Sequence, residues 1–378
     1  MPGFELINNE EQKAVNSIFK NGGVLFAHGF EKIRKHFHVR EFEKKTSIFF
    51  KCKHALAVTS GTAAIKIGLK ALGVKPGDEI ITQAFNFVAT IEAIIEVGAR
   101  PIIVNVDKTL NMDIKDLRKK ITKKTRVVLP VHMLGYPCDM QNIKKICKEN
   151  KIKILEDNCE SIGGKYNKKF LGSIGDIGVL SLDFGKTITT GEGGMILTNN
   201  KRYYNYCRQY HDHGHKNVKN LSRGNDKASM AGFNYRMTEL QGAIGKVQLK
   251  KLNFLLMDNR NKFKIIEKNI KVFKHREMPK NGQSNFDNFI FYIKSNYEKK
   301  KVLEILKKYK IGTKNLPDAI KWHCSFYWKH IFKKRERQSY LKTKKILDKA
   351  IAIPIFFKKS TSFYKKLSSE INKINEIV

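Results

Sequence analysis

The chain has 378 residues, of which 41% are hydrophobic and 10% aromatic, enough to bury a full core and to exclude a wholly disordered protein. Its formal net charge of +38 would suit a nucleic-acid-binding protein, but lysines occur in every segment instead of forming one basic stripe. An ordinary lysine-rich surface explains the charge at least as well, so we expect no nucleic-acid partner. The sequence shows no signal peptide and no run of about 18 apolar residues, which predicts a cytoplasmic protein without a membrane span.

Strands and helices alternate regularly from residue 54 onwards. The apolar pattern predicts strands at 54–58, 79–82, 101–106, 126–131 and 152–155, with helices at 61–72, 88–97, 114–121 and 142–149 between them. Two further strands are predicted at 177–182 and 195–198. This alternation predicts an α/β layer with a mainly parallel sheet, in which ligands bind beyond the carboxyl ends of the strands.

Several polar or aromatic residues fall at those carboxyl ends. They are the turn from Thr59 to Thr62, Phe87, His132 and Asp157. The turn leads from a strand into a helix, where backbone N–H groups and the helix dipole would face an anion. Taken alone, an ordinary Ser/Thr helix cap is the simpler interpretation of this turn. The convergence of all these positions at one edge of the sheet favours a ligand site.

The chain changes character along a helix that is predicted to begin at residue 239. A boundary is expected near residues 250–262, which divides the chain into a large α/β domain, residues 1–255, and a second domain, residues 256–378. The second domain is predicted to be smaller and of α+β type, with strands at 289–293 and 350–357, a helix at 299–308 and a final helix.

Lys186 stands in a Gly- and Thr-rich turn between two apolar strands. Burying an amine there would destabilise the fold unless the amine has a binding or catalytic role. Asp157 follows the strand predicted at 152–155 and stands 29 positions before Lys186 (186 − 157). The strands between them could place both residues in one cleft. Pyridoxal 5'-phosphate needs such a pair: an amine that bonds its aldehyde and an acid that keeps its pyridine nitrogen protonated. We therefore expect this cleft to hold pyridoxal phosphate.

Neither the cysteines nor the histidines predict a metal site. The six cysteines have no CxxC spacing and no metal-type pairing with histidine, which is typical of reduced structural thiols. His211, His213 and His215 alternate with Asp212 and Gly214, but a glycine-bearing loop gives them no fixed face. A polar loop that contacts substrate is the better interpretation.

Together these motifs resemble the DegT/StrS-type sugar aminotransferases, a branch of the fold-type I pyridoxal-phosphate enzymes. The resemblance covers about residues 50–250 and is weaker at both ends. It rests on 60–64 (SGTAA), the segment around Phe87, His132, 155–157 (LED), 175–176 (GD), Ser181, 185–194 (GKTITTGEGG) and 232–237 (GFNYRM). It implies a three-layer α/β/α large domain with a mainly parallel sheet and a smaller C-terminal α+β domain.

The resemblance also implies a role for individual residues. Lys186 would hold the cofactor and then move the substrate's α-proton, and cationic or apolar neighbours would lower the pKa of its amine. Asp157 would bond the pyridine nitrogen, and Phe87 would stack on the ring. The phosphate would be held by Ser60, Gly61, Thr62 and Ser181. Asn234 would reach in from a second subunit, which implies a homodimer with shared active sites.

Two positions are compared with their usual occupants in the family: Glu160, which departs from them, and Lys186, which bears on the type of reaction. Glu160 stands where the family usually has glutamine, near the cofactor's phenolic oxygen. A carboxylate there would repel a phenolate unless it is protonated or turned away. Some relatives carry histidine in place of the lysine and act as dehydratases, and Lys186 argues against that activity here.

Finer marks resemble the bacterial branch that makes 8-amino-3,8-dideoxy-manno-octulosonate, a Kdo-like sugar acid of lipopolysaccharide. These marks are residues 1–6, 212–215 and 322–331. They imply transfer of an amino group from L-glutamate to the 8-keto sugar acid, with candidate substrate residues His132, His213, His215, Arg236, Trp322 and His323. A cleft edged by basic residues would suit the carboxylate of such an acid.

Two alternatives remain open. The nearest enzyme alternative keeps the same chemistry but uses a nucleotide-linked 4-keto-6-deoxy sugar as the acceptor, because substrate choice is carried by long loops that a sequence pattern describes poorly. The alternative outside enzymes is a basic nucleic-acid-binding protein or a pyridoxal-phosphate-binding regulatory protein.

Overall fold

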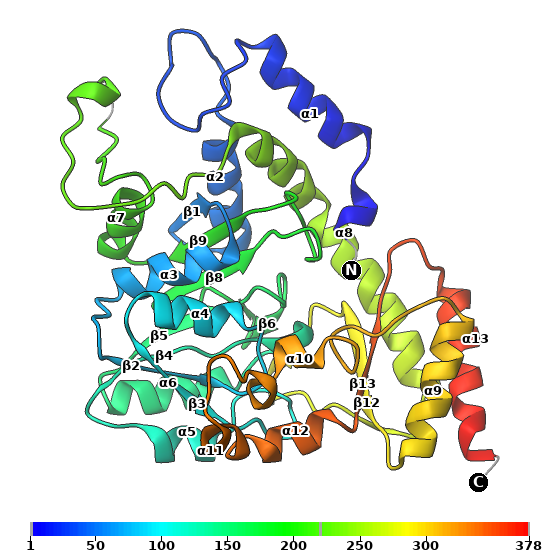
Figure 1. Cartoon of the computed structure of the whole chain (residues 1–378). Coiled ribbons are helices and arrows are strands. Elements are labelled where there is room, and N and C mark those ends of the chain that lie inside the picture. Colours follow the sequence, from blue (N-terminus) through cyan, green and yellow to red (C-terminus); the bar gives the residue numbers. More distant parts are fainter. Residues whose placement is uncertain (1–2, 219–220, 377–378) are drawn as a thin grey trace.

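A seven-stranded sheet forms the centre of the structure. The computed structural model describes residues 3–218 and 221–376 (Figure 1). In sheet order the strands are β1 (His54–Val58), β9 (Gly194–Thr198), β8 (Ile177–Ser181), β5 (Lys153–Asp157), β4 (Thr125–Val128), β2 (Glu79–Gln83) and β3 (Arg100–Val104). Within this sheet β9 runs against the direction of the other strands. The expected α/β fold with a mainly parallel sheet is confirmed.

Helices cover both faces of this sheet and produce three layers. One face carries α3 (Gly61–Ala71), α4 (Ala89–Glu96) and α7 (Lys201–Tyr210). The other carries α2 (His38–Phe50), α5 (Ile114–Lys120), α6 (Met140–Glu149) and the first half of α8 (Glu239–Asn269). Successive side chains of a strand point to opposite faces of the sheet. Leu56 of β1 therefore packs on the face with α3, α4 and α7, and its neighbour Ala55 packs on the face with α2 and α8.

A second core lies along the second half of α8. A three-stranded antiparallel sheet of β10 (Lys274–His275), β12 (Asn288–Tyr292) and β13 (Ala350–Pro354) packs against α8, α9 (Asn296–Lys308) and α13 (Thr361–Asn372). Because α8 is one continuous helix, the predicted boundary between residues 255 and 256 falls inside it. The division of the chain at that point stays a prediction.

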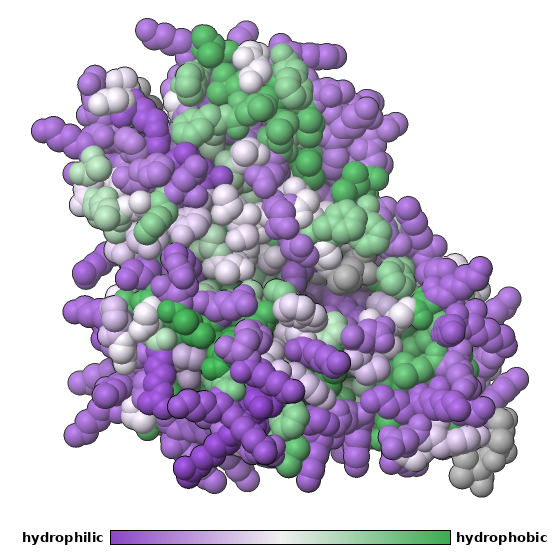
Figure 2. Space-filling model, viewed as in Figure 1, coloured by the Kyte–Doolittle hydropathy of each residue, from purple (hydrophilic) through white to green (hydrophobic). Residues whose placement is uncertain are grey.

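The remaining elements connect or flank these cores. They are α1 (Asn9–Lys20), α10 (Ile320–His323), α11 (Lys334–Gln338), α12 (Leu341–Leu347), a small sheet of β6 (Lys165–Tyr166), β7 (Lys169–Phe170) and β11 (Gly282–Gln283), and the 3₁₀ helices η1 (Phe4–Leu6), η2 (Met133–Gly135), η3 (Arg223–Asn225), η4 (Ser325–Tyr327) and η5 (Lys373–Glu376). Hydrophilic side chains are spread widely over the face in Figure 2. Among the helices of the described ranges, none is long and apolar enough to cross a membrane.

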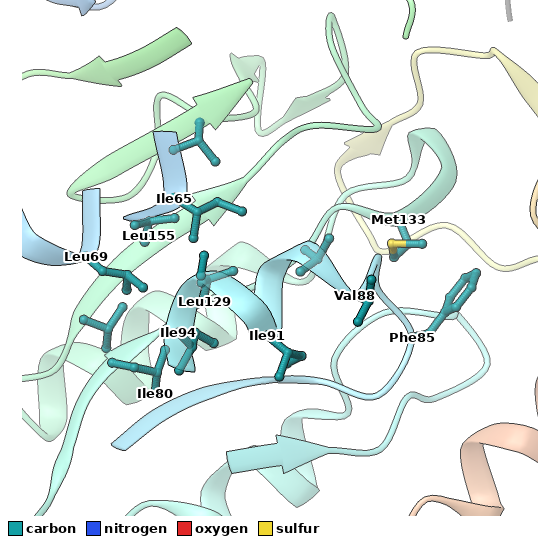
Figure 3. Close-up of a cluster of buried hydrophobic side chains, with 14 of the residues drawn as sticks. Ile65, Leu69, Ile80, Phe85, Val88, Ile91, Ile94, Leu129, Met133 and Leu155 are labelled. Atoms are coloured by element: carbon teal, nitrogen blue, oxygen red, sulfur yellow. The ribbon is translucent and has the colours of Figure 1, made fainter. Parts of the chain in front are cut away.

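The largest core lies between the sheet and helices α3 and α4. Ile65 and Leu69 stand four positions apart on α3, and Ile91 and Ile94 stand three apart on α4, so each pair lies on one face of its helix. Figure 3 shows these side chains gathered with Leu155 of β5. This packing holds α3 on one face of the sheet, with its first turn directly after the carboxyl end of β1.

Helices α2 and α7 are two of several helices that the sequence-based expectation lacks. In α2, Val39, Phe42 and Thr46 are buried at helical spacing, but the surrounding histidines and lysines hide this pattern. In α7, the side chain of Asn200 caps the helix by accepting a hydrogen bond from the backbone N–H of Arg202 (2.8 Å). Its tyrosines are modest helix formers, so tertiary packing decides the outcome there.

Arg276 joins the two cores as a buried cation. Its guanidinium donates to the backbone oxygens of Thr109 (2.6 Å) and Met133 (2.9 Å) and lies over the ring of Tyr136, and burial lowers its pKa to about 10. We expect Arg276→Ala to lower the free energy of unfolding by about 3 kcal/mol, because the buried carbonyl of Met133 and the half-buried carbonyl of Thr109 lose charged donors. Urea unfolding measures this. The exposed Arg335→Ala is the control, and equal unfolding curves for both variants would contradict the role.

Candidate active site

The candidate site lies at the carboxyl ends of β5 and β8. Asp157 is the last residue of β5 and is buried. Its Oδ2 accepts a hydrogen bond from the hydroxyl of Thr90 (2.9 Å), and its Oδ1 accepts one from the backbone N–H of Cys159 (3.1 Å). Each oxygen keeps a lone pair for a further donor. The two hydrogen bonds therefore orient the Asp157 carboxylate, and both of its oxygens can still accept a hydrogen bond from a ligand.

Lys186 lies in the turn that connects β8 to β9, which we call the lysine turn (residues 183–190). Backbone hydrogen bonds close the turn: the N–H of Lys186 donates to the oxygen of Asp183 (3.0 Å), and the N–H of Thr190 donates to that of Leu182 (2.9 Å). The Lys186 side chain is 20% exposed, and its Nζ lies 3.7 Å from Oε1 of Glu160. The amine thus reaches the site as a mostly buried group beside a carboxylate.

Glu160 is shared between Lys186 and a histidine from the C-terminal part of the chain. Its Oε1 lies 3.7 Å from Nζ of Lys186 and also 3.7 Å from Nε2 of His323. The side-chain amide of Asn315 donates to both oxygens (3.1 and 3.3 Å), and the backbone N–H of Leu134 donates to Oε2 (3.3 Å). The carboxylate is neither turned away from the lysine nor left without donors.

These contacts decide the charges of the site. Burial by itself raises the pKa of Glu160, but the charge of Lys186 outweighs it, together with His323 (protonated at the acidic pH where this carboxylate titrates), Lys314 and the Asn315 amide, and that pKa falls from 4.5 to about 2. Burial lowers the pKa of Lys186, but the charge of Glu160 outweighs it and raises the pKa above 10.5. The lowered amine pKa expected from the sequence is therefore wrong, because the nearest charge is an anion. Burial also lowers the pKa of His323, which leaves it uncharged at neutral pH.

The shift at Glu160 has a consequence for acid stability. Its pKa in the folded protein lies below the unfolded value of 4.5, so the ionised carboxylate stabilises the fold above that value. This contribution is lost as the pH falls from 4.5 toward about 2.

We expect Glu160→Gln to make Lys186 more reactive toward an amine reagent in the cofactor-free protein. Glutamine keeps the size of the side chain but removes the anion 3.7 Å from the amine, so the pKa of Lys186 falls and more of it is uncharged. Labelling at neutral pH should be about tenfold faster. Trinitrobenzenesulfonate labelling, read at residue 186 by peptide mass spectrometry, measures the pH profile. Glu192→Gln, at an exposed carboxylate close to the lysine turn, is the control, and a common profile for both variants contradicts the expectation.

The first turn of α3 and Ser181 form an anion cradle. The side chain of Ser60 caps α3 by accepting a hydrogen bond from the N–H three residues on (3.1 Å). The N–H groups of Gly61 and Thr62 have no helical acceptor and make no other hydrogen bond within the described chain. A Cβ on Gly61 would lie 2.9 Å from Cβ of Ser181 and 3.2 Å from Sγ of Cys159, so glycine keeps this space open. Two free donors, a hydroxyl and the helix dipole suit a phosphate.

Phe87 stands at the open edge of the site. Its ring is 43% exposed, and its centroid lies 5.2 Å from that of the His323 ring. The two segments are joined through their backbones, since the N–H of Asn86 donates to the oxygen of His323 and that of Val88 to the oxygen of Trp322 (both 3.1 Å). Trp322 itself is 60% exposed. The structure therefore brings His323 into the site and leaves the Trp322 ring in solvent.

Arg236 is engaged inside the protein. It donates to Oδ1 of the buried Asp212 (2.7 Å), which also accepts from Arg223 (2.7 Å to Oδ2) and from the side chain of Asn217 (3.0 Å). Burial would raise the pKa of Asp212, but these donors hold it well below its usual range. The charge expected to attract a substrate carboxylate is thus partly neutralised by an acid of the same chain.

Asn234, expected to reach the cofactor of a second subunit, and the expected substrate residues His213 and His215 lie near Asp212. Asn234 pairs with it through the backbone and is exposed, as is His213. Nδ1 of His215 lies 3.6 Å from Oδ2 of Asp226. No group of three or more His, Cys, Asp or Glu side chains in residues 3–218 and 221–376 is arranged to hold a metal ion.

His132 lies behind the site instead of inside it. Its ring is fully buried, with Nε2 3.1 Å from Oε2 of Glu156, and its Nδ1 accepts the N–H of Cys138 (3.0 Å). Because Glu156 and Asp157 are neighbours on β5, their side chains point to opposite faces of the sheet. Both ring nitrogens are used in the core, so the structure does not bring the His132 ring to a substrate.

Sequence reasoning missed several residues that shape the site: Thr90, Cys159, Asn315 and Lys314. Cys159 follows Asp157 by two positions, and a search of the residues around the acid could have found it. Asn315 stands 155 positions from the Glu160 that it contacts, and no local pattern marks it. Such partners become visible only in the folded chain.

Comparison with known sequences places this arrangement in a family. A profile of the DegT/DnrJ/EryC1/StrS aminotransferase family matches residues 6–369. The chain is 37% identical to GDP-perosamine synthase of Escherichia coli O157:H7 over 237 residues, 62% of this chain and 63% of that protein. It is 34% identical to GDP-perosamine synthase of Vibrio cholerae over 225 residues, 59% of this chain and 60% of that protein. The match thus spans less than two thirds of the length of these curated relatives.

Solved structures are similar over nearly the whole chain. The aminotransferase from Psychrobacter cryohalolentis, at 22% identity, has the same fold, with a TM-score of 0.84 over 98% of both chains. Escherichia coli GDP-4-keto-6-deoxy-D-mannose-3-dehydratase, solved with bound hydrated PLP, has a TM-score of 0.81 at 25% identity over 97% of both chains. Because the family profile covers almost all of its residues, this chain belongs to the DegT/DnrJ/EryC1/StrS aminotransferase family.

Proposed function

We propose that this protein is a pyridoxal-phosphate-dependent aminotransferase that moves an amino group from L-glutamate to a nucleotide-linked keto-sugar. One observation carries the proposal: an amine, an acid and an anion cradle lie at one edge of the sheet. Cys159 is a common neighbour of these groups. Its Sγ lies against Gly61, and the charges of Asp157 and Lys186 both act on the pKa of its thiol. This is the set of groups that the cofactor requires.

Apart from Glu160, whose negative charge would repel the cofactor's phenolic oxygen, the residues present fit pyridoxal phosphate. The N–H groups of Gly61 and Thr62 and the hydroxyl of Ser181 would hold its phosphate. Asp157 would accept a hydrogen bond from the protonated ring nitrogen, and the exposed ring of Phe87 would cover the cofactor ring. When bound, the cofactor supplies an electron sink and carries the amino group between the two half-reactions.

Lys186 performs the proton chemistry of the proposed reaction. Its amine begins as a cation beside Glu160, so it must lose a proton before it can act as nucleophile or base. Burial lowers the pKa of the neighbouring His323, which makes it a weaker base than this amine, so in the cofactor-free protein the proton stays on Lys186 beside Glu160. The hydroxyl of Thr90 meanwhile fixes the orientation of the Asp157 carboxylate through its hydrogen bond to Oδ2. A lysine at position 186 suits amino transfer better than dehydration.

We favour a nucleotide-linked 4-keto-6-deoxy sugar as the acceptor. Both relatives at 37% and 34% identity are GDP-perosamine synthases, and one structural neighbour is a GDP-4-keto-6-deoxy-D-mannose dehydratase. These relatives support this acceptor better than the 8-keto octulosonate expected from short sequence marks. The bond between Arg236 and Asp212 also weakens the argument for a sugar acid.

Incubation with L-glutamate and one ketone at a time tests the acceptor. The protein is loaded with pyridoxal phosphate, and 2-oxoglutarate is measured with GDP-4-keto-6-deoxymannose or with 8-oxo-3,8-dideoxy-manno-octulosonate. Turnover with the GDP-linked sugar alone supports the proposal, and turnover with the octulosonate alone replaces its acceptor. A protein that stays colourless after the cofactor is added contradicts the aminotransferase proposal itself.

We propose further that the active form is a homodimer with shared sites. Asn234, expected to reach the neighbouring site, is exposed. Four large apolar side chains are exposed on α1 and the segment after it: Phe19, Leu25, Phe30 and Ile33. Figure 2 shows hydrophobic side chains gathered in the upper part of the molecule. Exposed apolar groups of this kind favour contact with another chain. Light scattering should give twice the mass of one chain, and a single-chain mass for fully active protein would contradict the dimer.

A further inference from the structure

The first described residues lie against the lysine turn. Gly3 is buried, and a Cβ on it would lie 2.6 Å from the backbone oxygen of Lys186 and 3.1 Å from Cα of Ile188. The ring of Phe4 stacks on that of Phe184 in the same turn, with centroids 4.9 Å apart and planes at 18°. Residue 3 therefore contacts the backbone of the lysine whose amine is the centre of the site.

The residues that follow are anchored to two other parts of the chain. Oε2 of Glu5 accepts the backbone N–H of Phe357 (2.6 Å). The backbone oxygen of Leu6 accepts a hydrogen bond from Nζ of Lys251 on α8 (2.9 Å), and the same Nζ donates to the buried carboxylate of Glu11 (2.7 Å). The position of Gly3 is thus set by the C-terminal core and by α8.

A second line of contacts reaches the other end of the lysine turn. Glu11 accepts the side-chain amide of Gln248 (2.8 Å), and Oε1 of Gln248 accepts the backbone N–H of Thr189 (3.4 Å). Glu11, Gln248 and Thr189 are all buried, which makes an uncompensated loss of these bonds costly. Residues 3–11 therefore hold the turn at both Lys186 and Thr189.

We propose that residues 3–11 form a clamp that positions Lys186 toward Glu160 and the cofactor cleft, with Gly3 as a positioning residue. This inference rests on the role proposed above for Lys186. A side chain at position 3 would collide with the Lys186 carbonyl, and the backbone shift that relieves the collision would move Nζ. Displacing a reacting group by about 1 Å can cost on the order of 10²-fold in rate. Glycine is required here by the close approach of two backbones.

Gly3→Ala tests the clamp in the cofactor-free protein. The added methyl group displaces the Lys186 carbonyl and loosens its ion pair with Glu160, so labelling at residue 186 should become roughly three- to tenfold faster at neutral pH. The other groups near the amine (Cys159, Asp183, Asp157 and His323) are unchanged in the variant. Ile7→Ala is the matched control, because the Ile7 side chain is 46% exposed. Glu160→Gln, which lacks the ion pair, gives the upper limit.

Phe4→Ala is the second variant, since it removes the stacked ring without adding volume and carries the test if Gly3→Ala does not fold. A pH profile of labelling that moves toward lower pH in these variants, and not in Ile7→Ala, supports the clamp. Coincident profiles in all three variants overturn it, whatever their thermal stability. Labelling needs no cofactor, so it tests the clamp independently of the proposed function. The proposed function fails if the wild-type protein does not react with pyridoxal phosphate.

Discussion

Lys186→Ala should abolish the near-visible absorbance band of the protein with pyridoxal phosphate and slow amino transfer by at least ~10³-fold. The substitution removes both the amine that bonds the cofactor and the group that moves the substrate proton. The buried Lys314, whose charge acts on Glu160, is paired with Asp287 and is therefore not ready to replace it. Absorbance titration with the cofactor and 2-oxoglutarate release measure the two losses.

Lys169→Ala is the matched control, since Lys169 is an exposed lysine on β7. It should keep both the band and the activity of the wild-type protein. A band that persists in Lys186→Ala would place the covalent bond on another lysine and remove Lys186 from the mechanism.

Asp157→Asn should keep the absorbance band but slow amino transfer by roughly 10- to 150-fold, the equivalent of a charge-assisted hydrogen bond of about 1.5–3 kcal/mol. Asparagine keeps the shape of the side chain, and its oxygen can still accept the N–H of Cys159. It loses the negative charge that would hold a proton on the ring nitrogen. Single-turnover rates with L-glutamate, followed by the change in absorbance, measure this effect.

Thr90→Val separates charge from position at Asp157. It removes the hydroxyl that donates to Oδ2 (2.9 Å) and leaves the charge in place, so its effect should be smaller than that of Asp157→Asn. Equal losses in the two variants would mean that the orientation of the carboxylate, and not its charge, is what the reaction needs.

The large sheet could be predicted because its strands are buried on both faces. Each of its seven strands overlaps a predicted strand, since such strands are nearly continuous apolar runs between turn residues. The same logic placed Asp157 and Gly61 at one edge, because the carboxyl ends of parallel strands meet there. His132 shows the limit of that logic. It also follows a strand, but its ring is held by Glu156 on the opposite face.

The weaker predictions concern residues whose partners are distant in the chain. The pKa of Lys186 was expected to be lowered and is raised, because Glu160 lies beside the amine. Arg236 was expected to face a substrate, but Asp212 is its partner. In both cases a local pattern showed the charged residue and hid the opposite charge that folding brings to it.

Three features of the sequence are enough to infer the kind of chemistry: a lysine in a Gly/Thr turn, an acid at a strand end and a glycine at a helix start. These are local features, because turns, strand ends and helix caps depend on residues that are neighbours in the chain. The tertiary structure alone decided the charge of the lysine, the approach of His323 and Asn315 to Glu160, and the contact of Gly3 with the lysine turn. Those properties depend on distances between atoms far apart in the chain, which only the packing of the two cores around α8 sets.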